Sequence, residues 1–442
     1  MRIPKVKQEI SVSAATAVGL GAIIGAGIFV LSGSALSLAG SNALIAFVLV
    51  GFVAILIALE LGELGSIMPD VEGASYSYVY EAFGSELGFI TGIIFYASSV
   101  IAISAIAIGF GSYFSNILGL PSVATTISAA MLIILLAVLN LLGIKKAVNV
   151  DFALVAIKIA VLLAFIAFAI YFAFGSGHFV ASNFGVTSSQ NGIGPIAAAS
   201  IAILFAYSGF QTISTLTPKI KGGPNAAAKS ILLSVALSLV IYLAIIISML
   251  LIVPSSVYST SSADPISIAL DASAAPYLLK LAVSLGALIA TASASLAMFL
   301  RSSRIIYQLN SDGLIPKIIG KYDTKRDVST NAVLATAAIA IVMMFSGNVY
   351  TVASISVFGV LFTYLMSSLA LIHFRRIKRH GSFKAPFYPY LPAIAIIFVL
   401  AFMYGMPKQS MYIGAITVIV LLVVYYLFAR SKNNQAVKTK LF

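Results

Sequence analysis

The sequence predicts an all-α polytopic membrane protein with twelve transmembrane helices, and three observations support this prediction. Of the 442 residues, 61% are hydrophobic and only 9% are charged, whereas a soluble domain carries about 25% charged residues. Turn residues divide the chain into apolar stretches of the length that a bilayer requires, which is about 20 residues. The basic residues gather in alternate connections, as the positive-inside rule requires of a multi-pass protein.

The hydropathy pattern places the twelve spans in order along the chain. They cover residues 11–39, 42–67, 86–117, 122–142, 150–174, 194–217, 225–253, 276–302, 329–346, 349–373, 387–406 and 411–430. With the N-terminus inside, nearly all lysines and arginines, Arg301 and Arg304 among them, fall on the inner side. Only Lys280 and Lys408 fall outside, and Lys158 lies within a span. This distribution predicts a multi-pass protein of the cell (plasma) membrane with both termini cytoplasmic. It also accounts for the net charge of +13, so the lipid bilayer is an expected partner and nucleic acid is not.

The spans divide into two units of five. Spans one to five start from the inside and spans six to ten start from the outside, so the two units are inverted relative to each other. We therefore expect a first unit at 1–174, a second at 175–373, and two accessory spans with a cytoplasmic tail at 374–442. Transporters built from inverted repeats bind substrate where corresponding spans of the two halves are interrupted.

The first span carries four glycines near its middle, namely Gly19, Gly21, Gly25 and Gly27. Glycine costs up to about 1 kcal/mol in a helix relative to alanine, and it lets the backbone leave helical geometry. Unpaired backbone groups survive in a membrane only where protein or a wet cavity covers them. Two interpretations follow from this stretch: a substrate site made of main chain, or a small-residue face for close helix packing.

The sixth span has a comparable weak point. The run from Ile203 to Gln211 contains a Ser-Gly pair, Ser208-Gly209, and a polar glutamine at mid-depth. This span also begins the second unit of five. Its position therefore favours a second interruption that faces the first one.

Lys158 lies inside the fifth span, about nine residues and hence roughly 13 Å from its start. One interpretation is a lysine whose stem extends back to the cytoplasmic interface. The other is an intramembrane amine that faces the bundle, which marks a functional site by default. Burial would lower its pKa toward the physiological range, so that it could exchange a proton.

The sequence lacks the residues that a metal site or an enzyme active site would require. Cysteine is absent, which removes thiolate catalysis and cysteine-based metal sites. His178, His373 and His380 have no second ligand at metal spacing, so we expect neither a metal nor another cofactor. The spans contain no paired carboxylates, no HExxH and no Ser/His/Asp cluster. An enzyme is therefore not expected.

Five motifs, in order along nearly the whole chain, resemble those of one family. Gly25-Ala26-Gly27-Ile28-Phe29 resembles the G-[SA]-G-I-F signature of the amino acid–polyamine–organocation (APC) superfamily of permeases. The remaining motifs are Glu63-Leu64 with Pro69, Gly73 and Tyr76 to Gly84, then Asn140 to Lys146, Phe205 to Phe210, and Arg304 to Pro316. The resemblance is to the proton-coupled prokaryotic amino acid transporters in particular. It implies a LeuT-type fold, which is a 5+5 inverted repeat with helices 1 and 6 broken and two accessory helices.

The resemblance also implies a site for an amino acid. The substrate carboxylate would meet backbone N–H groups at Gly25, Ala26 and Gly27, where a helix N-terminus favours an anion. The residues expected to meet the amine through their carbonyls, or to cover the substrate, are Ala22, Ile23, Phe205, Ala206 and Ser208. Ile103 and Ser354 are candidates for the side-chain pocket. This chain departs from the pattern at Gln211, where many members carry an acidic residue, which puts a proton-carrying or cation-recognising role at that position in doubt.

By the same resemblance, Lys158 occupies the place of a sodium ion in sodium-coupled relatives. Its expected partners are the Gly21 carbonyl and a hydroxyl of Thr291, Ser293 or Ser295. The predicted function is symport, in which a secondary active transporter imports amino acids, with a preference for neutral ones, by alternating access and coupled to protons. An amino acid or amine exchanger with Lys158 as a fixed charge stays open. So does a membrane amino acid receptor without transport, and the oligomeric state is not predicted.

Overall fold

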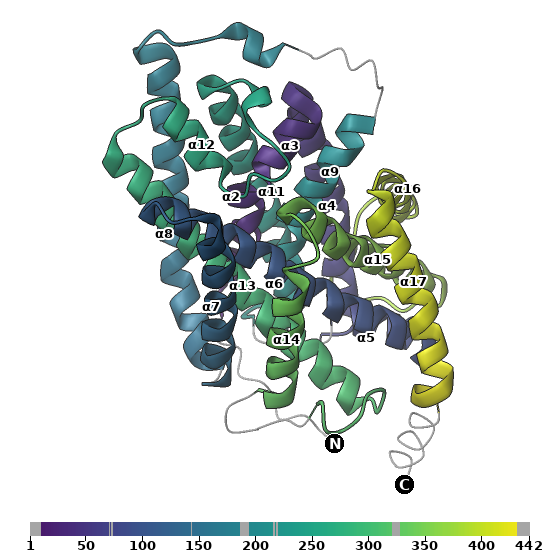
Figure 1. The fold of residues 1–442 in the computed structure, drawn as a ribbon. Coiled ribbons are helices and arrows are strands. Elements are labelled where there is room, and N and C mark those ends of the chain that lie inside the picture. Colours follow the sequence, from purple (N-terminus) through teal and green to yellow (C-terminus); the bar gives the residue numbers. More distant parts are fainter. Residues whose placement is uncertain are drawn as a thin grey trace.

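The computed structural model describes residues 10–69, 71, 74–142, 144–185, 194–214, 217, 220–320 and 328–430, with backbone alone at 26, 144–154, 212 and 429. The described residues form helices joined by short connections, and one isolated bridge pairs Ile10 with Ile220 (Figure 1). The prediction of an all-helical polytopic protein is confirmed.

The element bounds show where the chain departs from regular α-helix. The α-helices are α1 (Val12–Ile23), α2 (Ala26–Val30), α3 (Ser32–Ala39), α4 (Ala43–Ile67), α5 (Ser75–Phe83), α6 (Ser85–Leu118), α7 (Ser122–Leu141), α8 (Ile144–Ile170), α9 (Gly194–Tyr207), α10 (Gln211–Ser214), α11 (Gly223–Ile252), α12 (Pro265–Ala272), α13 (Tyr277–Ser311), α14 (Thr330–Met343), α15 (Val349–Arg376), α16 (Tyr390–Tyr404) and α17 (Lys408–Val424). Short 3₁₀ or π segments are η1 (Gly40–Asn42), η2 (Tyr171–Gly175), η3 (Ala181–Phe184), η4 (Ser208–Phe210), η6 (Ser255–Val257) and η7 (Tyr425–Ala429).

Nine helical stretches of the described chain are long and apolar enough to cross a membrane. Three shorter apolar helices, Gly194–Phe210, Thr330–Met343 and Tyr390–Tyr404, lie within further predicted spans. The count of exactly twelve spans, and the two inverted units, stay predictions.

Burial separates the inner helices from those at the periphery. In their most apolar windows, α15 is 78% buried and α13 is 72% buried, whereas the stretch Lys408–Phe428 is only 11% buried. Helix α7 exposes Val123, Ile127, Met131 and Leu135, which recur every four residues along one face. An apolar face that other helices leave uncovered is what contact with lipid chains requires.

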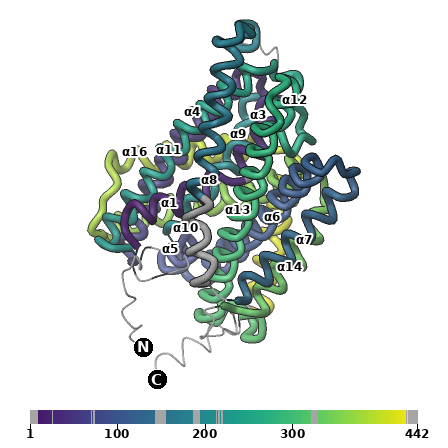
Figure 2. Tube along the Cα trace, turned by 90° about the vertical axis from the view of Figure 1, so that its left-hand side faces the viewer, coloured from purple at the N-terminus to yellow at the C-terminus, as the bar shows by residue number. Residues whose placement is uncertain are grey.

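The bundle has two ends that can be named by their short helices. Helix α12 lies at one end, beside α3, and α5 lies toward the other (Figure 1). Inside the bundle, α1, α8 and α13 pack against one another (Figure 2). Helix α13 continues to Ser311, nine residues beyond the predicted end of its span at 302.

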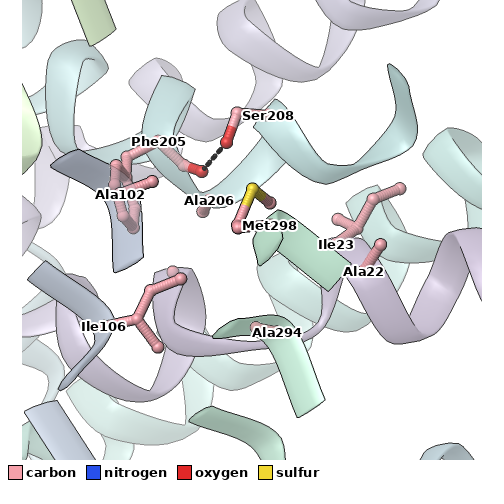
Figure 3. A pocket seen from close by; sticks show the side chains of 10 residues that line it. Ala22, Ile23, Ala102, Ile106, Phe205, Ala206, Ser208, Ala294 and Met298 are labelled. Carbon is pink, nitrogen blue, oxygen red and sulfur yellow. Dashed lines mark hydrogen bonds between the residues drawn. The ribbon is translucent and has the colours of Figure 1, made fainter. Parts of the chain in front are cut away.

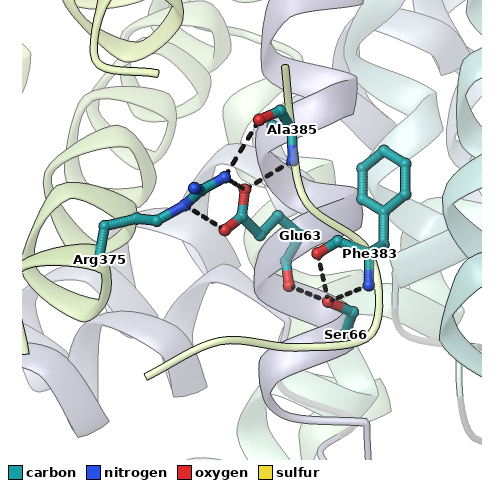
Figure 4. A network of polar contacts seen from close by, with 5 residues as sticks. All are labelled: Glu63, Ser66, Arg375, Phe383 and Ala385. Carbon is teal, nitrogen blue, oxygen red and sulfur yellow. Dashed lines mark hydrogen bonds and ion pairs between the residues drawn. The ribbon is translucent and has the colours of Figure 1, made fainter. Parts of the chain in front are cut away.

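A buried ion pair joins α4 to α15 and to the segment that follows α15 (Figure 4). The Arg375 guanidinium contacts both carboxylate oxygens of Glu63, with Nε 2.5 Å from Oε1 and Nη2 donating to Oε2 at 2.8 Å. The backbone N–H of Ala385 also donates to Oε2, at 2.7 Å. One turn along α4, Ser66 exchanges hydrogen bonds with the backbone of Phe383. A bidentate pair with an added backbone donor is a strong and directional link.

Replacing Glu63 with glutamine should destabilise the protein. Arg375 is only 14% exposed and Glu63 is fully buried, so the variant leaves a largely desolvated guanidinium without its carboxylate. We expect a loss of roughly 3 kcal/mol in the free energy of unfolding, measured as a lower unfolding midpoint of the detergent-solubilised protein. The control is Glu81→Gln, because its ion pair with Arg379 is about half exposed and should contribute under about 1 kcal/mol. Equal effects of the two variants would contradict the assignment.

Candidate functional site

Helical hydrogen bonding is interrupted at Ile24 and Gly25, between α1 and α2. Ile24 has φ −75° and ψ 79°, which is close to an inverse γ-turn. The Gly25 N–H accordingly donates to the Ile23 carbonyl at 2.8 Å. Helix α2 then starts at Ala26. The first N–H groups of a helix and the last carbonyls of the one before it have no partner within their own helices, so the interruption presents main-chain donors and acceptors at one place.

A second departure from α-helix occurs at Ser208 to Phe210. Helix α9 ends at Tyr207, η4 follows as a 3₁₀ turn, and α10 begins at Gln211. The Ser208 hydroxyl donates to the Phe205 carbonyl at 2.8 Å. A 3₁₀ stretch inside a longer helix tightens the backbone and often marks a functional position.

Two glycines let these interruptions touch through their backbones. A Cβ on Gly27 would lie 2.1 Å from the Ala206 Cα, and a Cβ on Gly209 would lie 2.1 Å from the Ala22 carbonyl oxygen. Backbone cannot yield to such an overlap as a flexible side chain can. The sequence suggested the alternatives of a binding site and a packing face for the first span; Gly27 packs closely against Ala206 and also lines a pocket described below.

Tyr242, on α11, connects the same two segments. Its hydroxyl donates to the Ile23 carbonyl at 2.6 Å and lies 3.2 Å from the Ala206 carbonyl. Its ring packs edge-on against Tyr207 at 5.1 Å between centroids. Sequence reasoning missed this residue, and a lone hydroxyl-bearing aromatic in an apolar span was the signal that could have found it.

A small pocket lies where the two interruptions meet α6 and α13 (Figure 3). Its lining is mostly apolar and consists of Ala22, Ile23, Gly27, Ala102, Ile106, Phe205, Ala206, Ser208, Ala294 and Met298. Six of these residues were predicted site residues. The other four come from α6 and α13 and were not predicted, because small and apolar residues inside a span carry no distinguishing signal.

The other predicted site residues lie outside this lining. Gly25 belongs to the interruption, Ala26 is the first residue of α2, and Gly21 lies one turn back in α1. Ile103 is buried on α6 beside the lining residue Ala102. Ser354 is engaged elsewhere, with its hydroxyl 2.8 Å from both the Thr351 carbonyl and the Ser410 hydroxyl.

Lys158 is fully buried on α8, and its ammonium connects α1 to α13. Nζ donates to the Gly21 carbonyl at 2.9 Å and to the Ser293 hydroxyl at 2.7 Å. Of the two other hydroxyls named for this role, Thr291 donates to carbonyls of its own helix at Ala287 and Leu288, and the Ser295 hydroxyl has no hydrogen-bond partner among the described residues. The structure therefore brings together Lys158, Gly21 and Ser293.

Arg301 is a second buried cation, and the sequence did not single it out. The predicted span ended at 302, which placed this arginine at the inner boundary. In the structure it lies within α13 and is 1% exposed. Among the described residues, no group of three or more histidines and carboxylates could hold a metal ion.

A bundle of apolar helices with irregular backbone beside a pocket is typical of integral membrane transporters. The particular family follows from comparison with known proteins, because the family model described as amino acid permease matches residues 15–438. The chain therefore belongs to the amino acid permease family of the APC superfamily. It is a multi-pass membrane transporter and not an enzyme.

Three curated relatives match nearly their full length. The chain is 29% identical to a methylthioribose transporter of Bacillus subtilis, over 95% of this chain and 92% of the relative. It is 26% identical to the branched-chain amino acid permease BcaP of the same organism, over 97% of this chain and 95% of the relative. BcaP of Lactococcus lactis is 28% identical, over 95% and 94% of the two chains.

Replacing Gly209 with alanine should separate the two interrupted segments, because its Cβ would overlap the Ala22 carbonyl. We expect a lower unfolding midpoint and at least a tenfold loss of amino acid uptake in proteoliposomes. Gly194→Ala is the matched control: it lies at the start of the same helix stretch, and no atom lies within 4 Å of its added Cβ. Full activity of the Gly209 variant would show that the segments need not touch.

Proposed function

We propose that this chain is a secondary active transporter that imports amino acids, preferably neutral ones, by alternating access and coupled to protons through Lys158. The observation that carries the proposal is the junction of the two interrupted segments beside a small apolar pocket, with a buried ammonium bound to the first segment. Membership of the amino acid permease family supports amino acid transport. The direction of transport, its coupling to protons and the alternating-access mechanism are what we propose.

The main chain supplies the groups that every amino acid needs. The N–H groups of Ala26 and Gly27 open α2, and the positive end of the peptide dipoles there favours the substrate carboxylate. The Ala22 carbonyl is among the last of α1 and has no partner within that helix by position. Together with the Phe205 carbonyl it would accept the substrate amine. Tyr242 already bonds the Ile23 carbonyl, so this hydroxyl would compete with the amine or share that acceptor with it.

The pocket lining supports a neutral side chain. Four of its residues, Ala102, Ile106, Ala294 and Met298, are apolar. Burying an ionised group against apolar residues is unfavourable because the group loses its hydration. Of the relatives, the three described above are named for branched-chain amino acids and for methylthioribose, whereas two others, from Arabidopsis thaliana, are named cationic amino acid transporters. The preference for neutral side chains therefore rests on the pocket lining.

Lys158 would couple the proton by holding or releasing the first interrupted helix. Its ammonium spans from the Gly21 carbonyl on α1 to the Ser293 hydroxyl on α13. Deprotonation removes the charge that strengthens both hydrogen bonds, so α1 would be less firmly tied to α13. A proton bound from one side and released to the other would then accompany each change of access. The overall frame for this motion is the LeuT-type 5+5 repeat with both termini cytoplasmic, which we include in the proposal.

The test of coupling is uptake of labelled leucine into proteoliposomes with an imposed pH gradient. A gradient that is acidic outside should accelerate uptake severalfold over equal pH. Uptake that ignores the gradient but requires amino acid inside would identify an exchanger, in which Lys158 is a fixed charge. Saturable binding without any uptake would identify a receptor.

Replacing Lys158 with alanine should abolish gradient-driven uptake while leaving measurable leucine binding, because the pocket itself does not contain this side chain. Lys280→Ala is the control, since this lysine lies at the start of α13 and pairs with Asp271 near the surface. Normal gradient-driven uptake in the Lys158 variant would overturn the coupling assignment.

A further inference from the structure

Arg301 is a fully buried guanidinium that the proposed transport mechanism does not use. It lies on α13 three residues beyond Met298, which lines the pocket. Three residues correspond to about 4.5 Å along a helix axis. The position is on the side of the pocket that leads toward α5, away from α12. A permanent cation therefore lies directly beyond one wall of the pocket.

The contacts of Arg301 hold it in place without neutralising it. Nε donates to the Ser99 hydroxyl at 2.9 Å, and Nη1 donates to the Ser208 carbonyl at 3.1 Å. The guanidinium carbon lies 4.9 Å from the centroid of the Phe95 ring. Nη2 is buried and has no hydrogen-bond partner among the described residues. Hydroxyl, carbonyl and ring dipoles stabilise a cation, but they carry no opposing net charge.

No carboxylate of the described chain pairs with Arg301. Glu60, which is fully buried on α4, accepts a hydrogen bond from Ser368 at 2.5 Å, and Glu63 is held by Arg375. Arginine keeps its proton under all physiological conditions. Inside a protein its field is screened far less than in water, so it acts over the few ångströms to the neighbouring pocket.

Arg301 lies close to the pocket, because it contacts or adjoins residues that line it. Ser208 lines the pocket, and its carbonyl accepts from Arg301. Met298 is on the same helix one turn away, and Ser99 lies one turn from the lining residue Ala102 on α6. Arg301 thus contacts or adjoins three of the elements that build the pocket: α6, η4 and α13.

We propose that Arg301 determines specificity by charge: its uncompensated field makes the pocket reject amino acids with a cationic side chain. This inference rests on the proposed function, because it assumes that the pocket binds amino acids. The chemical class it assigns is zwitterionic substrates whose side chains are neutral, with anionic side chains disfavoured less than cationic ones of equal length. An apolar lining alone would disfavour both signs of charge alike.

A purely structural role makes a different prediction. If Arg301 only ties α6, η4 and α13 together, any substitution lowers the affinity for all ligands in the same proportion. If its charge selects, the neutral variant Arg301→Gln changes the ranking of ligands, and Arg301→Lys, which keeps the charge, preserves it. The ratio of the affinities for two ligands distinguishes these roles even where the variant is less stable than the wild type.

The experiment measures binding of three ligands of similar length to the purified full chain: norleucine, lysine and 2-aminoadipate. Their side chains end in a methyl group, an ammonium and a carboxylate. We expect wild type to bind norleucine at least a hundredfold more tightly than lysine. In Arg301→Gln this preference should fall about tenfold, while the preference for norleucine over 2-aminoadipate should rise. Arg301→Lys should retain the wild-type ranking in both respects.

Arg379→Gln is the matched control, because it removes the same charge from an exposed pair with Glu81 and should leave the ranking unchanged. An unchanged ratio of lysine to norleucine in Arg301→Gln would overturn the inference, as would a wild type that binds lysine as well as norleucine. Failure of wild type to bind any of the three ligands would instead count against the proposed function. If Arg301→Gln does not fold, Arg301→Met in the same assay carries the test, because its unbranched apolar stem preserves most of the packing.

Discussion

The site depends on the direct contact between the two interrupted segments. Gly27 faces the backbone of Ala206, and Gly209 faces the carbonyl of Ala22, with no space for a side chain at either point. This approach brings the main-chain groups freed at Ile24 and Gly25 next to those of η4, and it leaves the pocket beside them. Because unpaired backbone in a membrane must be covered by protein, each interruption provides part of the cover for the other. Tyr242 completes the arrangement by bonding a carbonyl from the first segment.

Buried charge is handled in three different ways, and the differences bear on function. Glu63 and Arg375 neutralise each other in a bidentate pair that joins α4 to α15. Lys158 donates to a carbonyl on α1 and to a hydroxyl on α13. Arg301 is held by dipoles and a ring face, and it cannot lose its proton. Two buried cations thus contact the interrupted segments, Lys158 through α1 and Arg301 through η4.

The residues of the site differ in how well they could be predicted from the sequence. Glycines within a span and a lysine within a span are rare enough to stand out, so Gly27, Gly209 and Lys158 were visible from residue type and position. For the hydroxyl partner of Lys158, the sequence indicated only a group of hydroxyls on one span that includes Ser293, because the rotation of α13 about its axis decides which of them faces α8. Ala102, Ile106 and Ala294 resemble every other small or apolar residue in the bundle. The burial of Arg301 could not be read from the sequence, because a charge near the predicted end of a span can lie at the membrane interface or inside the bundle.

The sequence by itself determined the class of protein and the order of its elements. Low charge, long apolar stretches and Gly-rich interruptions are local properties, and lipid imposes helix on any apolar segment that must satisfy its own backbone. Motifs in order then identified the family, which the match over residues 15–438 bears out. Only the tertiary structure decided which helices face one another, which carbonyl receives the Lys158 ammonium, and that Arg301 lies beside the pocket without a carboxylate partner in the described chain. These features depend on how far each helix is rotated about its axis and how deep it lies in the bundle. Contacts between residues hundreds of positions apart contribute to both, and no local sequence pattern encodes them.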